Sequence, residues 1–208
     1  MTQRFILASG SPRRRELLTD MGITFTVIKP DIEEKRRAGE TPIAYVTRLS
    51  REKALAVSAR LDQGADEAAL ILAADTTVIL AADTLGVEDG TGEILEKPAS
   101  VEDARAMLTR LRGRPHTVAT ALTLLKKVPG AAVQLDTRVT QSIVYMRQYS
   151  DAEMDAYITS GGPFDKAGGY AIQDEVFHPA ERYEGSYTNI VGLPVETLKD
   201  MLTAMGVG

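Results

Sequence analysis

The first residues that could do chemistry lie directly after an apolar run near the start of the chain. Residues 5–15, FILASGSPRRR, join that run to a turn of small residues and then to a helix start at Ser11-Pro12. A helix N-terminus already carries partial positive charge, so Arg13, Arg14 and Arg15 do not stabilise this helix. With the exposed backbone N–H groups they favour a phosphate site, the alternative being a solvated basic turn.

A carboxylate at the end of a second apolar run is the main candidate for catalysis. The continuous apolar run Leu70–Ala74 predicts a buried strand, and it ends at Asp75. A buried carboxylate is costly unless it is paired, hydrogen-bonded or bound to a metal. Because ligands of α/β proteins sit at the carboxyl ends of strands, we expect Asp75 to act as a general base or metal ligand.

Basic residues in two other stretches are weaker candidates. Arg48, Arg51 and Lys53 fall late in a predicted long helix, where residues three or four apart share a face. For most of these charges a solvated helix face is the expected environment. Lys97 precedes Pro98, and a lysine held in this way can reach a phosphate as a point charge.

A glycine-rich stretch, Gly161–Gln173, has the composition of a ligand loop or of a tight structural turn. Its dense glycines imply positive φ angles or a close approach of the backbone. Gln173 carries both a donor and an acceptor and can read the edge of a base. His116 and His178 are too few and too distant in sequence to indicate a metal cluster, and we expect them to be ordinary structural or surface histidines.

The elements that must position these residues alternate between strand and helix early in the chain. Ser100 and Ser150 have the composition of helix caps, each with an acidic residue three positions later. The middle of the chain has an antiparallel pattern, so the prediction is a mixed α/β sheet covered by helices. The predicted strands are 4–9, 24–28, 70–81, 117–125 and 139–149, and the predicted helices are 12–21, 42–61, 100–113, 150–159 and 194–205.

Composition limits the classes of protein to which the chain can belong. It has 208 residues, 44% of them apolar, no cysteine and a net charge of −5, which predicts one domain over residues 1–208 and excludes disulfides and thiolate metal sites. Residues 1–60 hold 12 Lys and Arg against 7 Asp and Glu, whereas residues 61–208 hold 12 against 22. This distribution favours a small anionic ligand over a nucleic acid polymer. The N-terminus resembles neither a signal peptide nor a membrane span, which fits a cytoplasmic protein.

Seven stretches in series resemble the Maf family of nucleoside triphosphate pyrophosphatases. They are LASGSPRRRELL, SREKA, AADTTV, LEKP, GRPHTVATA, DKAGGYAIQ and GSYTNIVGLP, and they extend from residue 7 to residue 194. The resemblance implies a bilobed fold like that of the inosine triphosphatases, with a central cleft. It also implies cleavage of the α–β phosphate link with Mg²⁺ or Mn²⁺, and a homodimer.

By the same resemblance, Asp75 matches the family's proton acceptor and a metal ligand, and Glu33 lies at an acidic position that helps to hold the metal. Lys53 and Lys97 are assigned with Asp75 to catalysis. The matched positions for substrate binding and specificity are Ser9, Arg13, Arg14, Thr76, Lys166 and Gln173.

Arg13, Thr76 and Gln173, with Asp165-Lys166, are similar to the family branch that acts on dTTP and UTP. One alternative is the branch that prefers 7-methyl-GTP, and another is a nucleotide-binding regulator of cell division with little turnover. Two features depart from the family pattern, the longer segment 81–93 and the pair Gly168-Gly169. Neither removes a residue assigned to chemistry.

Overall fold

The chain divides into two units that share three long strands, in a computed structural model that describes residues 4–61, 68–80 and 92–207. Unit 1 comprises residues 1–75, 120–140 and 192–208, and unit 2 comprises residues 76–119 and 141–191. Most of the segment 81–93, which departs in length from the family pattern, lies outside the described residues.

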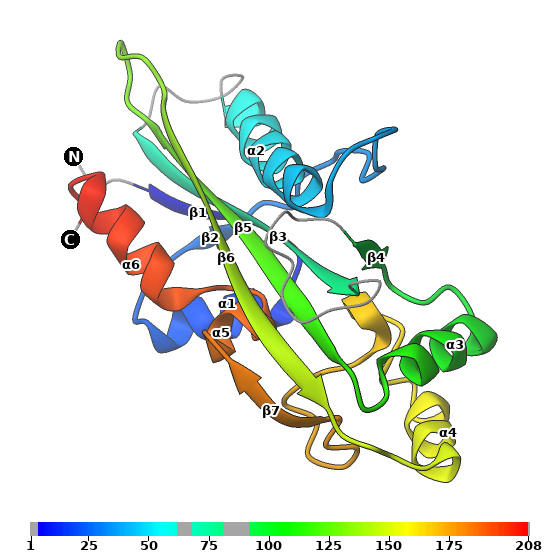
Figure 1. Cartoon of the computed structure of the whole chain (residues 1–208). Helices are drawn as coiled ribbons and strands as arrows, with labels where there is room; N and C mark the ends of the chain where they lie inside the picture. Colours follow the sequence, from blue (N-terminus) through cyan, green and yellow to red (C-terminus); the bar gives the residue numbers. More distant parts are fainter. Residues whose placement is uncertain (1–3, 62–67, 81–91, 208) are drawn as a thin grey trace. The chain divides into compact units, whose positions relative to one another are not determined.

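The strands form a mixed sheet in which the order of neighbours is β2-β1-β3-β5-β6-β7, with β4 also paired to β3 (Figure 1). β1 is parallel to β2 and β3, whereas the β3–β4 and β6–β7 pairs are antiparallel. The prediction of a mixed α/β sheet flanked by helices is therefore confirmed. The strands are β1 (Arg4–Ala8), β2 (Thr26–Val27), β3 (Ala69–Leu80), β4 (Glu93–Leu95), β5 (Pro115–Lys127), β6 (Gln134–Met146) and β7 (Ala180–Glu184).

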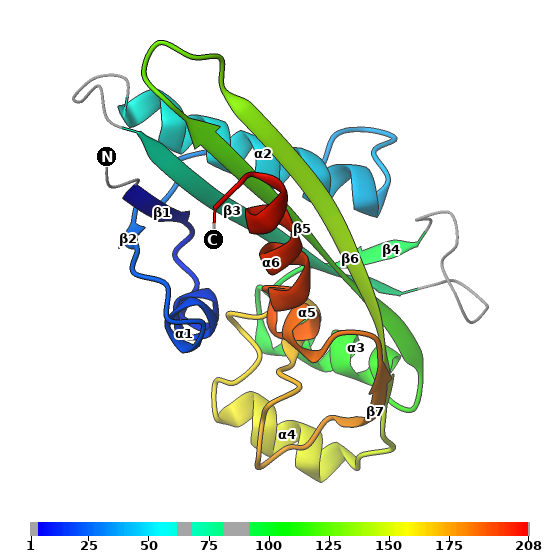
Figure 2. The same cartoon turned by 90° about the vertical axis from the view of Figure 1, so that its left-hand side faces the viewer.

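Unit 1 covers both faces of its strands with helices. Leu72 of β3 belongs to a buried cluster with Leu198 of α6 (Val195–Ala204), and α1 (Pro12–Asp20) contributes to the same cluster. The neighbouring Ile71 belongs instead to a cluster with Val57 of α2 (Pro42–Leu61). Figures 1 and 2 show α2 and α6 on opposite faces of β3. Burial on both faces explains why this strand reads as a continuous apolar run.

The start and end of α1 follow the sequence prediction only in part. Ser11 occupies the N-cap position, but its side chain makes no capping bond. The other end is a Schellman motif, in which Gly22 (φ 72°) donates to the carbonyl of Thr19 at 2.8 Å and Ile23 to that of Leu18 at 3.1 Å. Gly22 therefore ends the helix as its position predicts.

Unit 2 has its own apolar core beneath two capped helices. The predicted cap Ser100 accepts from the backbone N–H of Asp103 at 3.2 Å, and Ser150 with Glu153 forms a full capping box. Both predicted helix starts are confirmed because caps depend on residues close in sequence. The helices of this unit are α3 (Val101–Leu111), α4 (Asp151–Thr159), the 3₁₀ turn η1 (Ala167–Gly169) and α5 (Tyr187–Val191).

Strand boundaries differ from the predictions in both directions. The predicted strand 24–28 shortens to two residues, Thr26–Val27, whereas 117–125 lengthens to Pro115–Lys127 and 139–149 shifts to Gln134–Met146. The polar start of β6 is a strand because it pairs with β5, and such pairing overrides local composition. Within the described part of the chain, no helix combines the length and apolar character needed to cross a membrane.

Candidate active site

Asp75 lies inside β3, which continues to Leu80, so it is not at the carboxyl end of the strand as expected, and only 8% of its surface is exposed. Strand β1 is parallel to β3 with Ala8 opposite Ala73, so Ser9, the residue after β1, continues in the direction of Asp75. Burial raises the pKa of the Asp75 carboxyl, and the charges of Lys53 and Arg14 oppose that rise. A carboxylate in this environment is a better proton acceptor than one in water.

Lys53 joins Asp75 to a second carboxylate. Its Nζ donates to Asp75 Oδ1 at 2.6 Å and to Glu34 Oε2 at 2.9 Å, and the lysine is 6% exposed. Helix α2 directs this side chain inward at a position between the buried residues of its apolar face. A buried ammonium is tolerated here because two carboxylates compensate it.

Among the three early arginines, Arg14 is held in this part of unit 1 by two hydrogen bonds of its guanidinium. Its Nη1 donates to Ser9 Oγ at 3.0 Å and its Nε to the carbonyl of Gly192 at 2.9 Å. Burial lowers the pKa of its guanidinium, while Asp75 and Glu34 act in the opposite direction. The charge of Arg14 therefore acts on the same carboxylates as Lys53. Gly192 belongs to the matched stretch GSYTNIVGLP, and its carbonyl helps to hold Arg14.

Arg15 differs from the other two early arginines in burial. Arg13 and Arg14 are both partly buried, whereas Arg15 is exposed and has a solvated surface position. Thr76 follows Asp75 directly in β3 and is also partly buried.

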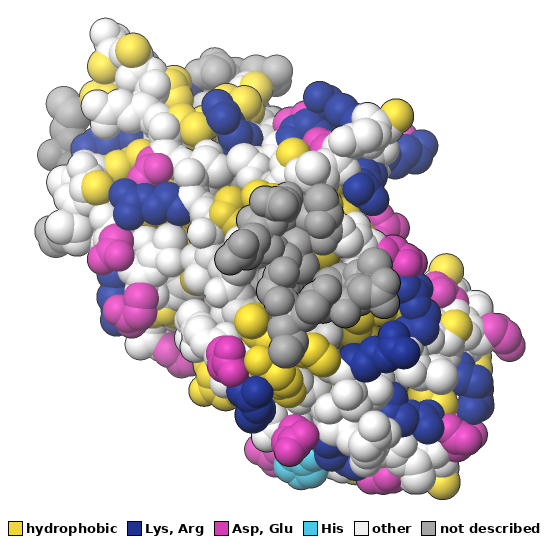
Figure 3. All heavy atoms as spheres, in the orientation of Figure 1, with side chains coloured by type: hydrophobic (Ala, Val, Ile, Leu, Met, Phe, Trp, Pro, Cys, Tyr) yellow, Lys and Arg dark blue, Asp and Glu magenta, His cyan; other side chains and the backbone are white. Residues whose placement is uncertain are grey.

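Glu34, rather than its neighbour, is the acidic residue that unit 1 brings to Lys53. The predicted Glu33 points elsewhere: its carboxylate pairs with Lys35 at 2.5 Å and its side chain is 71% exposed. The sequence did not identify Glu34, because two adjacent glutamates in a segment without regular structure give no signal of which one contacts Lys53. Lys35, Arg36 and Arg37 of this segment are exposed, and Figure 3 shows Lys and Arg side chains gathered at the upper right of the molecule.

Unit 2 carries the other predicted residues, on loops with firmly bonded backbones. Lys166 Nζ donates to the carbonyl of Gly162 at 2.6 Å and pairs with the carboxylate of Asp165. Gly168 donates to the carbonyl of Glu96 at 3.1 Å, which links this loop to the segment of Lys97. Gln173 and Lys97 are both exposed.

The glycine pair of this loop has the backbone conformation that its composition predicts. Gly168 and Gly169 have φ angles of 72° and 71°, and a Cβ on Gly168 would lie 3.0 Å from a methyl group of Val78. Tyr170, the next residue, is buried, and its hydroxyl lies 2.6 Å from Nε2 of His116. Burial lowers the pKa of His116 to about 3, so it is a neutral structural histidine, as expected.

The donor set of unit 1 fits a metal ion that arrives with a phosphate ligand. No group of three or more His, Cys, Asp and Glu residues suited to a metal occurs in residues 4–61, 68–80 and 92–207. Asp75 and Glu34 nevertheless converge on one cation, the ammonium of Lys53. Mg²⁺ is usually held by one or two carboxylates together with water and substrate phosphates. Asp75 and Glu34 can supply the two carboxylates.

Comparison with known proteins gives full-length matches. The family model described as "Maf-like protein" matches residues 4–205. The chain is 45% identical over 202 residues to a dTTP/UTP pyrophosphatase of Myxococcus xanthus, covering 97% of this chain and 92% of that protein. It is 42% identical over 205 residues to a protein of the same name from Syntrophus aciditrophicus, covering 97% and 91%.

Solved structures with lower similarity also match along the chain. A HAM1 protein from Coxiella burnetii is 16% identical, with a TM-score of 0.44 and coverage of 98% of this chain and 100% of that one. A nucleoside-triphosphatase, a dITP/XTP pyrophosphatase, from Mycobacterium abscessus is 14% identical, with a TM-score of 0.41 and coverage of 98% and 94%.

Proposed function

The chain belongs to the Maf-like family, and from that premise we propose that it hydrolyses dTTP and UTP to the monophosphate and pyrophosphate. The observation that carries this proposal is the buried contact of Lys53 with Asp75, joined by a second bond from Lys53 to the half-exposed Glu34 and set beside the charge of Arg14. The names of relatives at 42% and 45% identity support the substrate assignment. The physiological role that follows is removal of unwanted nucleotides from the pool.

Asp75 is the proposed proton acceptor for the attacking water. The oxygen of that water bonds to the α-phosphorus, and a proton of the water passes to a carboxylate oxygen of Asp75. The bond between the α-phosphorus and the α–β bridging oxygen breaks. Pyrophosphate leaves with the electron pair of that bond. The pKa of Asp75, raised by burial, suits a group that must take up a proton during the reaction.

Cationic side chains bind and orient the triphosphate in this proposal. Arg14 is partly buried and is held by Ser9 and Gly192, so its guanidinium is oriented before the substrate arrives. Lys53 compensates the two carboxylates and opposes the rise in the pKa of Asp75, which favours the ionised form that accepts the proton. Arg13 and the exposed Lys97 add phosphate contacts, and Lys166 orients the loop of unit 2.

Asp75 and Glu34 are the proposed ligands of the divalent cation. Mg²⁺ or Mn²⁺ bound there would polarise the phosphoryl group and neutralise developing charge. Glu33, the acidic position suggested by the resemblance, has a side chain 71% exposed and paired with Lys35, so Glu34 takes its place in the proposal.

Base selection is assigned to unit 2 and to the residues that match the dTTP and UTP branch. Gln173 is exposed and has both a donor and an acceptor for a pyrimidine edge, and Thr76 and Arg13 are the other matched positions. A homodimer and a cytoplasmic location are further proposals from the family resemblance. Light scattering of the purified protein tests the first, and fractionation of cells tests the second.

The test is pyrophosphate release from a panel of nucleotides with Mg²⁺ or Mn²⁺. We expect dTTP and UTP among the best substrates; a clear preference for 7-methyl-GTP would assign the chain to the other branch. Asp75→Asn should lower kcat by about 10²- to 10⁴-fold while nucleotide binding persists.

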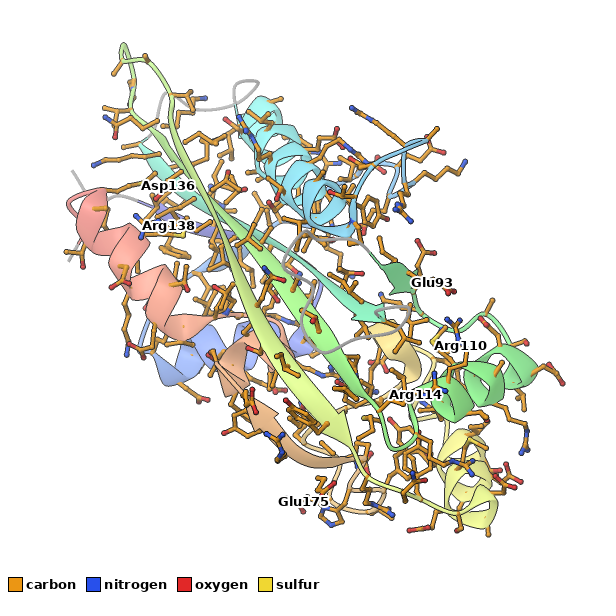
Figure 4. The ribbon with its side chains drawn as sticks, in the orientation of Figure 1. Glu93, Arg110, Arg114, Asp136, Arg138 and Glu175 are labelled. Atoms are coloured by element: carbon orange, nitrogen blue, oxygen red, sulfur yellow. The ribbon has the colours of Figure 1, made fainter. Side chains whose placement is uncertain are left out.

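Asp136→Asn is the matched control for this substitution. Asp136 lies on β6 of unit 1 and pairs with Arg138 of the same strand at 3.0 Å (Figure 4). Its ion-pair partner is Arg138, whereas Lys53 is bonded to Asp75 and Glu34, so its variant should keep the parent rate. A protein that binds nucleotide but releases no pyrophosphate would be the regulator that the sequence leaves as an alternative.

A further inference from the structure

The segment 28–41, which carries Glu34, contains no helix or strand. It connects β2 to α2, and its backbone is held by side chains that project from the first three turns of α2. Tyr45 donates through its hydroxyl to the carbonyl of Glu34 at 3.1 Å. The position of the Glu34 carboxylate near Lys53 therefore depends on contacts made by α2.

Arg48 makes the most extensive of these contacts. Its Nε and Nη2 donate to the two carboxylate oxygens of Glu40 at 2.7 and 2.8 Å, and its Nη1 donates to Glu52 at 2.9 Å. Nη2 also donates to the carbonyl of Lys35, the residue after Glu34, at 2.9 Å. All three guanidinium nitrogens are thus engaged, and the side chain is only 15% exposed.

Glu40 completes the connection from the far end of the segment. Its carboxylate also accepts from the backbone N–H of Arg37 at 3.0 Å, and its side chain is 10% exposed. The hydrogen bonds of Arg48 lower the pKa of Glu40 to about 2, so the pair stays ionised at neutral pH. The segment is therefore fixed to α2 on both sides of Glu34.

We propose that Arg48 is a positioning residue for the hydrolysis, acting through the backbone of segment 28–41 to hold Glu34 against Lys53. The role rests on the proposed function of Lys53 and Asp75 but on different contacts. Arg48 and Lys53 lie on the same helix, so one rigid element places both the cation and its second carboxylate. This use differs from the solvated helix face expected for most basic residues of the stretch.

Arg48→Lys is the decisive variant, because lysine keeps the charge but loses the fork that binds two oxygens of Glu40 and the carbonyl of Lys35. We expect kcat/KM to fall about 10- to 100-fold through displacement of Glu34. Tyr45→Phe, which removes one bond to the same segment, should have a smaller effect in the same direction.

Arg110→Lys is the matched control. Arg110 of α3 also makes a two-oxygen ion pair, with Glu93 at 2.8 and 2.5 Å, but within unit 2 (Figure 4). Its variant should leave kcat/KM within about twofold of the parent, as surface substitutions usually do.

A double-mutant cycle with Glu34→Gln separates positioning from a general structural effect. If Arg48 acts through Glu34, Arg48→Lys should change kcat/KM less than about twofold in the Glu34→Gln background. Effects that multiply, or a parent-like rate for Arg48→Lys alone, would overturn the proposal.

Hydrogen exchange provides a readout that does not depend on activity. The amides of Arg37 and Glu40, bonded at 3.0 and 3.1 Å within the segment, should exchange faster in Arg48→Lys but not in Arg110→Lys. Unchanged exchange would overturn the proposal. Faster exchange in a protein that releases no pyrophosphate from any nucleotide would contradict the proposed function and the positioning role, and leave only a structural contact.

Discussion

The proposed chemistry of unit 1 and the proposed recognition residues of unit 2 differ in how their side chains are held. In unit 1 the charged ends of Lys53, Asp75 and Arg14 are buried. Lys53 donates a hydrogen bond to Asp75, and the charge of Arg14 acts on the same carboxylate. In unit 2 the side chains of Lys97 and Gln173 are exposed, and the backbone around them is fixed instead. Charges gain strength for catalysis when water is excluded, whereas recognition requires groups that remain accessible to the base.

This contrast predicts that one substitution has different consequences in the two units. Lys53→Met leaves Asp75 without its nearest cation, and the loss of one partner of a buried pair costs about 3–5 kcal/mol. The same change should lower kcat by about 10²-fold or more. Urea unfolding and initial rates measure the two effects.

Lys97→Met is the corresponding change in unit 2. Since Lys97 is exposed, its variant should raise KM for the triphosphate but keep the free energy of unfolding within about 0.5 kcal/mol of the parent. Equal losses of stability in the two lysine variants would contradict the contrast between buried and exposed cations.

The next effect concerns the buried part of unit 2. The pKa of His116 in the folded protein, lowered by burial to about 3, lies below the ordinary value of 6.5. As pH falls below 6.5, His116 takes up a proton in the unfolded chain but not in the folded chain. This group should therefore lower the free energy of unfolding by about 1.4 kcal/mol per pH unit. His116→Gln should remove that part of the slope, and the exposed His178→Gln should keep it; urea unfolding between pH 4 and 7 is the measurement.

Gln173→Ala tests whether an exposed residue of unit 2 affects recognition without affecting the fold. Loss of one or two hydrogen bonds to the base, each worth about 1 kcal/mol, should raise KM for dTTP and UTP by about tenfold. The free energy of unfolding should stay within about 0.5 kcal/mol. Glu175→Ala, at a nearby exposed position, is the control and should have parent-like kinetics (Figure 4).

Arg110→Ala is expected to have the least effect. The variant loses the ion pair that links α3 to β4, the strand before Lys97, but both partners are substantially exposed. Exposed pairs contribute about 0.2–1 kcal/mol, so the melting temperature should fall by a few degrees at most. A loss of activity as large as that expected for Lys53→Met would show that β4 positions Lys97 much more strictly than its exposure indicates.

Short-range features of the fold followed from the sequence. The caps at Ser100 and Ser150 and the helix end at Gly22 depend on residues within a few positions, and all three are confirmed. The cap at Ser11 is wrong in detail, because Ser9 rather than Ser11 supplies the side-chain acceptor in that turn: its Oγ accepts from the backbone N–H of Ser11 at 3.2 Å. The start of β6 required knowledge of its partner strand.

The candidate site shows the same division between features that the sequence indicates locally and contacts between distant residues. The apolar run before Asp75 and the basic turn at Arg13-Arg14-Arg15 indicated a catalytic carboxylate and an anion site, and the seven motifs identified the family. The pairing of Asp75 with Lys53 joins residues 22 positions apart, and that of Arg14 with Gly192 joins residues 178 apart. No local pattern encodes such contacts.

Residue types and their order were therefore enough to identify the family and to indicate the buried acid, because these depend on composition and on motifs read along the chain. Which of two adjacent glutamates meets Lys53 was decided by the fold, through Tyr45 and Arg48 of α2. A segment without regular structure has no periodicity that sets the direction of its side chains. Its conformation is set by the distant groups that bond to its backbone, and these come together only in the folded chain.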